Sequence, residues 1–179
     1  MKIGLFFSNF SGGGIQRVML TLAKGFQEAG HEVHIVVVEA KGPLKEDVPQ
    51  GVKIINLQTG QASRSIFKLV SYLNTEKPTV LLSAQTHFNV VAILAKLFST
   101  WKGKLVLSEH ITIGNMTHNW KEKLFPLIAR LSYRLADLVL LVSEGAANHF
   151  IERTHLPASL IRTIYNPFDI EKIRIMAEE

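Results

Sequence analysis

Three consecutive glycines, Gly12, Gly13 and Gly14, stand between an apolar run and an amphipathic run near the amino terminus. A glycine turn lets the backbone come close to a ligand because no Cβ intervenes. The helix expected to follow begins with free N–H groups and the positive end of its dipole, which favours phosphate. The pattern predicts a phosphate-bearing ligand at this turn. A tight turn without a ligand is the alternative.

Further polar or titratable residues follow the expected strands. In an open parallel sheet, ligands bind outside the carboxyl ends of the strands, where the strand order reverses. The residues just after each strand are therefore the ones most able to take part in chemistry. They are 9–14, Glu39, 85–89, Glu109, His110, Ser143, Glu144, Tyr165 and Asn166.

Apolar runs and amphipathic runs alternate along the chain. Strands are expected at 2–8, 31–38, 51–57, 79–83, 104–108, 138–142 and 160–164. Helices are expected at 15–26, 65–77, 88–98, 117–136 and 144–153, and from about residue 170. Strands alternating with helices at this spacing predict an α/β fold, a Rossmann-like, doubly wound and mainly parallel sheet of about seven strands with helices on both faces.

Two of these helices carry more specific expectations. Ser65 is of the residue type that caps a helix amino terminus, and Pro78 ends the same segment. The 117–136 helix is partly basic, and Pro126 is expected to kink it or to mark its start. Its leucines and isoleucine are expected to face the core; they are Leu124, Leu127, Ile128, Leu131 and Leu135.

Composition narrows the possible classes of protein. The chain has 179 residues, of which 47% are hydrophobic and 20% charged, as expected for one globular domain with a real core. Without cysteine it can form neither a disulfide nor a thiolate site, which fits a cytoplasmic location. The net charge of +5 favours anionic partners. There is neither a visible signal peptide nor an apolar run of about 18 residues.

Known nucleotide and metal motifs fit only in part. Gly12 and Gly14 satisfy the first half of a dinucleotide fingerprint, and Glu39 lies where its ribose-binding acid would be. Arg17, however, takes the position where close packing of helix and strand requires a small residue. The glycines are not followed by the Gly-Lys-Ser/Thr of a phosphate loop, and no Asp-x-Asp pair exists to hold a divalent metal. Neither a metal site nor a bound cofactor is expected.

A combination of segments resembles one enzyme family. The segments are Gly12-Gly-Gly-Ile-Gln-Arg17, Gly30-His-Glu-Val-His34, Ser143-Glu144 and Ile164-Tyr-Asn-Pro-Phe-Asp169. In this order they resemble the amino-terminal half of family 4 glycosyltransferases, which have the two-domain GT-B architecture. The resemblance implies an amino-terminal, acceptor-side domain at 1–165 and a hinge or linker helix at 166–179. The family's carboxyl-terminal domain, which grips the nucleotide and carries a Glu-x7-Glu motif, is not represented.

The resemblance also implies an activity. Family members move a sugar from a nucleotide diphosphate sugar to an acceptor, usually with retention of configuration and without a bound metal. By this resemblance Gly12, Gly13 and Gly14 approach the donor diphosphate, and His110 lies near the transferred sugar. Substrate or acceptor contacts are expected from Arg17, Gln85, His87, Asn89 and Glu109. The chain alone is expected to be inactive or nearly so.

The expected partners follow from the same resemblance. They are a nucleotide-sugar donor, a saccharide or lipid-linked acceptor, the carboxyl-terminal domain and an anionic membrane surface, but not nucleic acid. The basic and aromatic residues of the 117–136 helix would meet that surface from the cytoplasmic side. They are Trp120, Lys121, Lys123, Phe125, Arg130 and Arg134. A self-contained nucleotide-binding module and a dehydrogenase-like domain are the alternatives.

Overall fold

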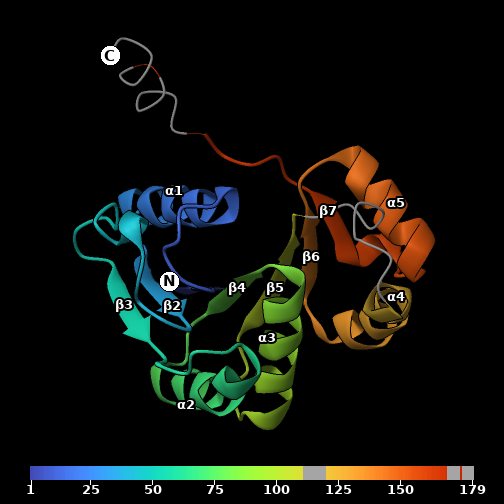
Figure 1. Ribbon diagram of the computed structural model, residues 1–179, viewed down its shortest axis with the longest axis horizontal. Coiled ribbons are helices and arrows are strands. Elements are labelled where there is room, and N and C mark those ends of the chain that lie inside the picture. Colours follow the sequence, from blue (N-terminus) through green and yellow to red (C-terminus); the bar gives the residue numbers. More distant parts are fainter. Residues whose placement is uncertain (111–119, 169–173, 175–179) are drawn as a thin grey trace.

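A seven-stranded sheet forms the centre of the molecule (Figure 1). The computed structural model describes residues 1–110, 120–168 and 174, and for 120–125 it describes the backbone alone. The strands are β1 (Lys2–Phe7), β2 (Glu32–Val37), β3 (Lys53–Asn56), β4 (Val80–Ala84), β5 (Lys104–Glu109), β6 (Leu138–Leu141) and β7 (Ile161–Thr163). All neighbours are parallel, in the order β3-β2-β1-β4-β5-β6-β7. The predicted Rossmann-like α/β fold is confirmed.

In the described part of the chain, five α-helices connect the strands. They are α1 (Gly14–Glu28), α2 (Ile66–Glu76), α3 (Thr86–Phe98), α4 (Trp120–Ser132) and α5 (Glu144–Thr154). Short 3-10 turns lie at η1 (Pro43–Lys45), η2 (Ser63–Ser65), η3 (Tyr133–Leu135) and η4 (Ala158–Leu160). Of the helix expected from about residue 170, the structure describes residue 174 alone, and its backbone is helical.

The predicted cap of α2 is wrong. Ser65 makes no capping bond; its hydroxyl is buried, 2.6 Å from the Thr59 hydroxyl, and donates to the Gln61 carbonyl oxygen. The predicted stop before Pro78 is confirmed, since Lys77 ends α2 in the left-handed conformation at φ 46°. Ser65 belongs to the preceding 3-10 turn η2, and its hydroxyl bonds to Gln61 and does not cap α2.

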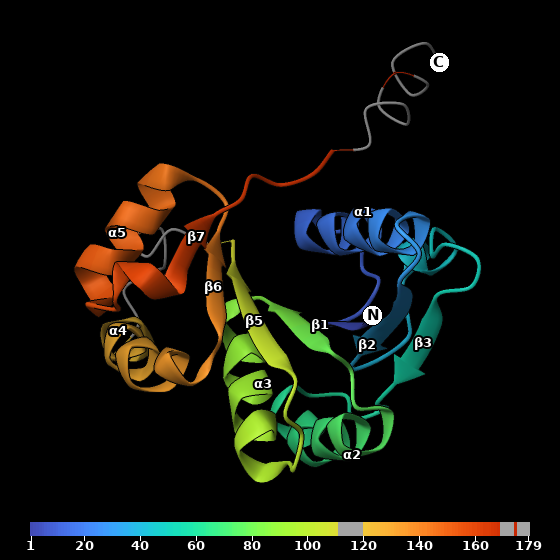
Figure 2. The ribbon, with the colours of Figure 1, turned by 180° about the vertical axis from the view of Figure 1, so that it is seen from behind.

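The two faces of the sheet are covered unequally. One core joins β1, β4, β5 and β6 to α2, α3 and α5. The other core packs α1 and Leu44 of η1 against the opposite face. Both views show α1 across the sheet from α2 and α3, with α4 and α5 beside β6 and β7 (Figures 1 and 2).

The helix α4 presents a different face to the core from the one expected. Four large apolar side chains of α4 and η3 are exposed to between 43% and 68%; they are Leu127, Ile128, Leu131 and Leu135. Among the described side chains of 126–136, the buried ones are instead Ala129, Tyr133 and Ala136. The expectation for these four residues is therefore wrong, whereas Leu124 lies outside the described side chains. Pro126 lies inside α4 and does not begin it. Of the helices that the structure describes, none is long and apolar enough to cross a bilayer.

Two ion clusters tie the elements together at the amino ends of the strands. The Glu76 carboxylate of α2 accepts from Lys2 at 2.9 Å and from Lys53 at 2.6 Å, and these bonds lower its pKa to about 2. Asp137 accepts from Lys96 at 2.6 Å, Lys104 at 2.9 Å and the Leu105 N–H at 2.9 Å. Partial burial would raise the pKa of Asp137, but these bonds lower it to about 2.

Candidate functional site

The order of the strands reverses between β1 and β4. β1 leads to α1 on one face of the sheet, whereas β4 leads to α3 on the other. A crevice for ligands is expected at such a switch point, outside the carboxyl ends of the strands. The segments that leave this edge are Ser8–Gly14 after β1, Gln85–Asn89 after β4 and His110 after β5. The topology thus brings the predicted glycine turn and the predicted polar residues to one edge.

The glycine turn at this edge is open. Gly12, Gly13 and Gly14 are all exposed, and a Cβ built on Gly12 or Gly14 would meet nothing within 4 Å. Gly12 has φ +90°, a conformation that favours glycine. Helix α1 has neither a side-chain cap nor an acidic residue in its first turn. The first turn of a helix leaves N–H groups without helical acceptors, so these amides are available to an anion.

A buried glutamine, which the sequence reading missed, braces the turn. Gln16 lies in the first turn of α1 and is only 6% exposed. Its Nε2 donates to the Ser8 hydroxyl at 3.2 Å and to the Ser11 hydroxyl at 3.4 Å. A polar residue on the buried side of an amphipathic helix is the signal that could have found it, because a buried amide needs partners.

The loop after β2 supports the turn from behind. The Phe10 side chain is fully buried, its N–H donates to the Lys41 carbonyl at 2.9 Å, and its carbonyl accepts from Leu44 N–H at 3.1 Å. Gly42, with φ +121°, lies so close to this backbone that an added Cβ would stand 2.3 Å from the Phe10 carbonyl oxygen. Glu39, which the dinucleotide pattern would place on a ribose, forms an ion pair with Lys41.

His110 follows the last residue of β5 and is half-buried. Its Nε2 lies 3.0 Å from the Ser108 hydroxyl. Burial lowers the pKa of His110, so the imidazole is neutral near pH 7. Val106 of β5 packs against the core that holds α1, and side chains alternate along a strand, so Ser108 projects to that face. His110 contacts the Ser108 hydroxyl and so lies on the same face, which carries the glycine turn. A neutral imidazole there can accept or donate a hydrogen bond to a hydroxyl group.

Glu109 projects to the opposite face and is only 2% exposed. Thr86 and Asn89 of α3 each donate to its carboxyl at 2.8 Å, and the Tyr133 hydroxyl donates as well. Burial raises the pKa of Glu109, and the bonds from Tyr133, Asn89 and Thr86 oppose the rise. Burial and the nearby Glu109 charge also raise the pKa of Tyr133 well above its ordinary value. Tyr133 is a second polar partner that the sequence reading missed.

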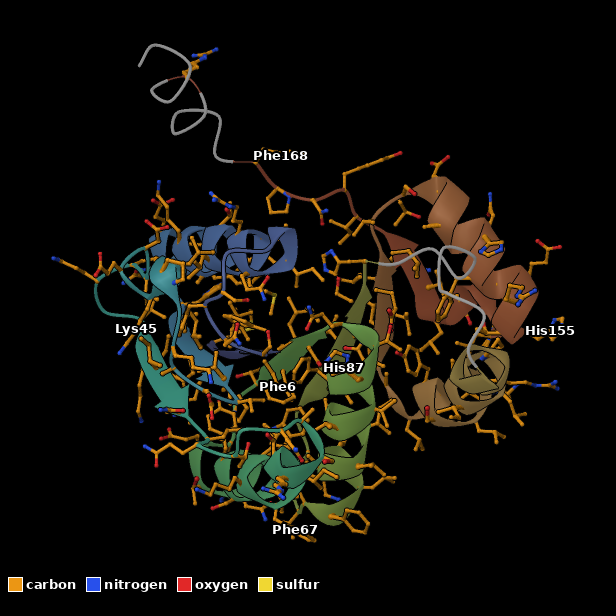
Figure 3. All side chains as sticks on the ribbon, in the orientation of Figure 1. Phe6, Lys45, Phe67, His87, His155 and Phe168 are labelled. Atoms are coloured by element: carbon orange, nitrogen blue, oxygen red, sulfur yellow. The ribbon has the colours of Figure 1, made fainter. Side chains whose placement is uncertain are left out.

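The remaining predicted residues differ in exposure. Gln85 is half-buried at the N-cap of α3, with the unusual combination of φ 82° and ψ 137°. His87 is exposed at the amino end of α3, where Figure 3 labels it, and its ring lies 4.2 Å from that of Phe88. Arg17 is exposed on the first turn of α1. Asn89 is completely buried, so it reaches the edge only through its bonds to Glu109 and to the Ser108 carbonyl oxygen.

Comparisons with known proteins agree with this geometry. Residues 12–172 match the model of Glycosyltransferase Family 4. A Campylobacter jejuni protein, named N-acetylgalactosamine-N,N'-diacetylbacillosaminyl-diphospho-undecaprenol 4-alpha-N-acetylgalactosaminyltransferase, is 26% identical over 185 residues, which cover 96% of this chain and 49% of that protein. This chain therefore spans about half the length of that relative.

Solved structures share the fold. Anabaena HepE in complex with UDP-glucose matches with a TM-score of 0.71 at 17% identity, over 99% of this chain and 50% of that one. Sucrose-phosphate synthase from Thermosynechococcus elongatus matches with a TM-score of 0.74 at 12% identity, over 99% of this chain and 52% of that one. Since the family model covers most of its length, the chain belongs to glycosyltransferase family 4, and its sheet is the Rossmann-like fold of the amino-terminal half of GT-B enzymes.

Proposed function

We propose that this chain is the amino-terminal, acceptor-side domain of a retaining glycosyltransferase. The enzyme moves a sugar from a nucleotide diphosphate sugar to a saccharide or lipid-linked saccharide, without a bound metal. Residues 1–165 form the domain, and 166–179 lead toward a carboxyl-terminal donor-binding domain. Family membership supports this reading over a self-contained nucleotide-binding module or a dehydrogenase domain.

The observation that carries the proposal is the open glycine turn before an uncapped helix. The amides of this turn would receive the donor diphosphate, because they combine free N–H groups with the positive end of a helix dipole. The complex of HepE with UDP-glucose supports a nucleotide sugar as the ligand of this fold. Donor contacts through Gly12, Gly13 and Gly14 would then be mostly backbone contacts.

The acceptor side of the site would be built from β5 and α3. His110 would contact the transferred sugar or the acceptor hydroxyl, since its neutral imidazole lies on the face of the glycine turn. Gln85 and His87, at the amino end of α3, would contact the acceptor, as would Arg17 of α1. Asn89 and Glu109 are enclosed by protein and would act on substrate only through the groups they hold. The name of the Campylobacter relative supports a lipid-linked acceptor.

The outer side of α4 would contact the cytoplasmic face of an anionic membrane. The exposed apolar row consists of Leu127, Ile128, Leu131 and Leu135, and the exposed Arg130 and Arg134 lie among them. Burying a leucine is worth about 1.5–3 kcal/mol, and each basic residue near an anionic surface adds about 1 kcal/mol. Such a surface would hold the enzyme where a lipid-linked acceptor is found.

Sugar transfer by the full gene product tests the enzymatic proposal. Labelled UDP-N-acetylgalactosamine and UDP-glucose are offered with undecaprenyl diphosphate-linked saccharides, in the presence and absence of EDTA. We expect transfer that EDTA does not abolish and a product with the anomeric configuration of the donor. The 179-residue chain alone is expected to transfer little or no sugar. An inverted product, or multiple turnovers by this chain alone, would contradict the respective part of the proposal.

Sedimentation with vesicles tests the membrane contact. The double variant Leu127→Ser/Leu131→Ser is expected to bind phosphatidylglycerol vesicles at least about tenfold more weakly than the unmodified chain. Leu97→Ser is the control, because Leu97 is a 54% exposed leucine that belongs to α3 and not to α4 or η3. Equal binding to phosphatidylglycerol and phosphatidylcholine vesicles would exclude the charge-assisted contact.

A further inference from the structure

The Glu109 carboxyl joins three elements at the carboxyl edge of the sheet, although almost none of it is exposed. It ends β5, receives two hydrogen bonds from α3, through Thr86 and Asn89, and receives one from Tyr133 of η3. At 2% exposure it has no free surface for a sugar. Because a carboxyl is costly to bury, each of the three donors stabilises this arrangement.

Ser108, the residue before Glu109, is also bonded to the amino end of α3. The Ser108 carbonyl oxygen accepts from the Asn89 side chain at 3.1 Å and from the Gln85 N–H at 3.3 Å. Gln85 has a positive φ that costs a non-glycine residue about 1–3 kcal/mol, so the surrounding bonds must hold it in place. The end of β5 and the start of α3 are thus joined by four hydrogen bonds, from Thr86, Asn89 (two) and Gln85.

His110 comes directly after this anchored pair and projects to the other face of the sheet. Its contact with the Ser108 hydroxyl depends on where the β5 backbone is held. We propose that Glu109 is a positioning residue. With Tyr133 as its partner, its carboxyl fixes the end of β5 to α3 and so holds His110 half-buried on the face of the glycine turn. The benefit for sugar transfer rests on the function proposed above, whereas the anchoring itself does not.

The pKa of the His110 imidazole is a measurement that would stay constant if Glu109 only stabilised the fold. NMR titration of isotope-labelled histidines in this chain gives the pKa of His110, whose signals are assigned with His110→Gln. In Glu109→Ala and in Tyr133→Phe we expect the imidazole to become more solvated and its pKa to rise toward the ordinary value of about 6.5. Glu109→Gln keeps an oxygen for Asn89 and Tyr133, and we expect it to restore most of the original pKa.

A matched control separates anchoring from loss of stability. Asp137→Asn loosens an ion cluster at the opposite edge of the sheet, so it should lower the melting temperature and leave the pKa of His110 unchanged. If Glu109→Ala does not fold, Tyr133→Phe, which removes a single hydroxyl, decides. An unchanged His110 pKa in the folded variants would overturn the proposal, as would a Glu109→Gln chain whose His110 titrates like that of Glu109→Ala.

Kinetics of the full gene product extend the same comparison to catalysis. We expect Tyr133→Phe to lower kcat severalfold, with the KM for the donor within about twofold of its original value, since the donor meets the glycine turn. A kcat that falls only in proportion to the folded fraction would contradict a positioning role. If the His110 pKa responds as expected but no sugar is transferred from any donor, the proposed function fails and the anchoring inference stands.

Discussion

Replacing Gly14 by aspartate should separate the stability of α1 from its role in binding the donor. Gly14 is the first residue of the helix, is exposed, and has no atom within 4 Å of the position of an added Cβ. An aspartate therefore fits without displacing its neighbours. Its charge lies at the positive end of the helix dipole, where an acidic residue stabilises the helix by about 0.3–1 kcal/mol. We expect the melting temperature to stay constant or rise by about 1–4 °C.

The same charge should weaken binding of a diphosphate. At about 5 Å and an effective dielectric constant of about 20–80, one added negative charge opposes the nearest phosphate charge by roughly 1–3 kcal/mol. This corresponds to a roughly 5- to 150-fold weaker binding of UDP, and uridine, which has no phosphate, should be unaffected. The variant should thus be at least as stable as the original protein and yet bind the donor poorly.

Isothermal titration calorimetry of UDP into the full gene product measures this effect, beside a thermal melt of each variant. Gly25→Asp is the matched control, because Gly25 lies in the same helix, is exposed, and is also open around its Cβ position. It changes the net charge equally, at a distance from the turn. Unaltered UDP binding by Gly14→Asp, or equal losses in both variants, would refute a diphosphate site at the glycine turn.

Three further predictions concern stability, each measured by thermal denaturation. Gly42→Ala should lower stability by more than about 2 kcal/mol, because φ +121° and contact with the Phe10 carbonyl leave no room for a methyl group; a neutral change would contradict this. Burial lowers the pKa of His34, which is 1% exposed, so this histidine takes up a proton at higher pH in the unfolded protein than in the folded one. Stability should therefore fall as the pH drops below about 6.5, and His34→Gln should reduce this dependence of stability on pH. The pKa values of Glu76 and Asp137 are lowered to about 2, so the ionised carboxylates stabilise the fold above the ordinary carboxyl pKa, and this stabilisation is lost as the pH falls toward 2. Glu76→Gln and Asp137→Asn should therefore reduce the loss of stability between about pH 4.5 and 2. An acid slope equal to that of the original chain would contradict the ion clusters.

The sheet could be predicted from the sequence because its signal is local. Each of the seven strands is a short apolar run, and the structure places every one within a few residues of the predicted range. Parallel strands buried on both faces need such runs, and the helices between them show a helical period. The edge that carries the glycine turn follows from topology alone.

The errors have a common physical cause, which is that the partner of a side chain is set by tertiary packing. Leu127, Ile128, Leu131 and Leu135 were expected inside, but among the described side chains of 126–136 the buried ones are Ala129, Tyr133 and Ala136. Tyr133 is buried because its hydroxyl has Glu109 as an acceptor, 24 residues away in the sequence. Gln16 is buried for a similar reason, since two serines of the preceding turn accept its amide. Hydrophobic periodicity carries no information about such pairs.

The most direct test of the central claim is an amide NMR titration of the full gene product with UDP, beside a parallel titration with uridine. We expect UDP, but not uridine, to shift the N–H signals of Gly13, Gly14 and Ile15, because the diphosphate would accept hydrogen bonds from the start of α1. The largest shifts should fall on these amides and on His110. If UDP shifts the N–H signals of these glycines no more than uridine does, the turn does not bind the diphosphate and the account of this site is wrong.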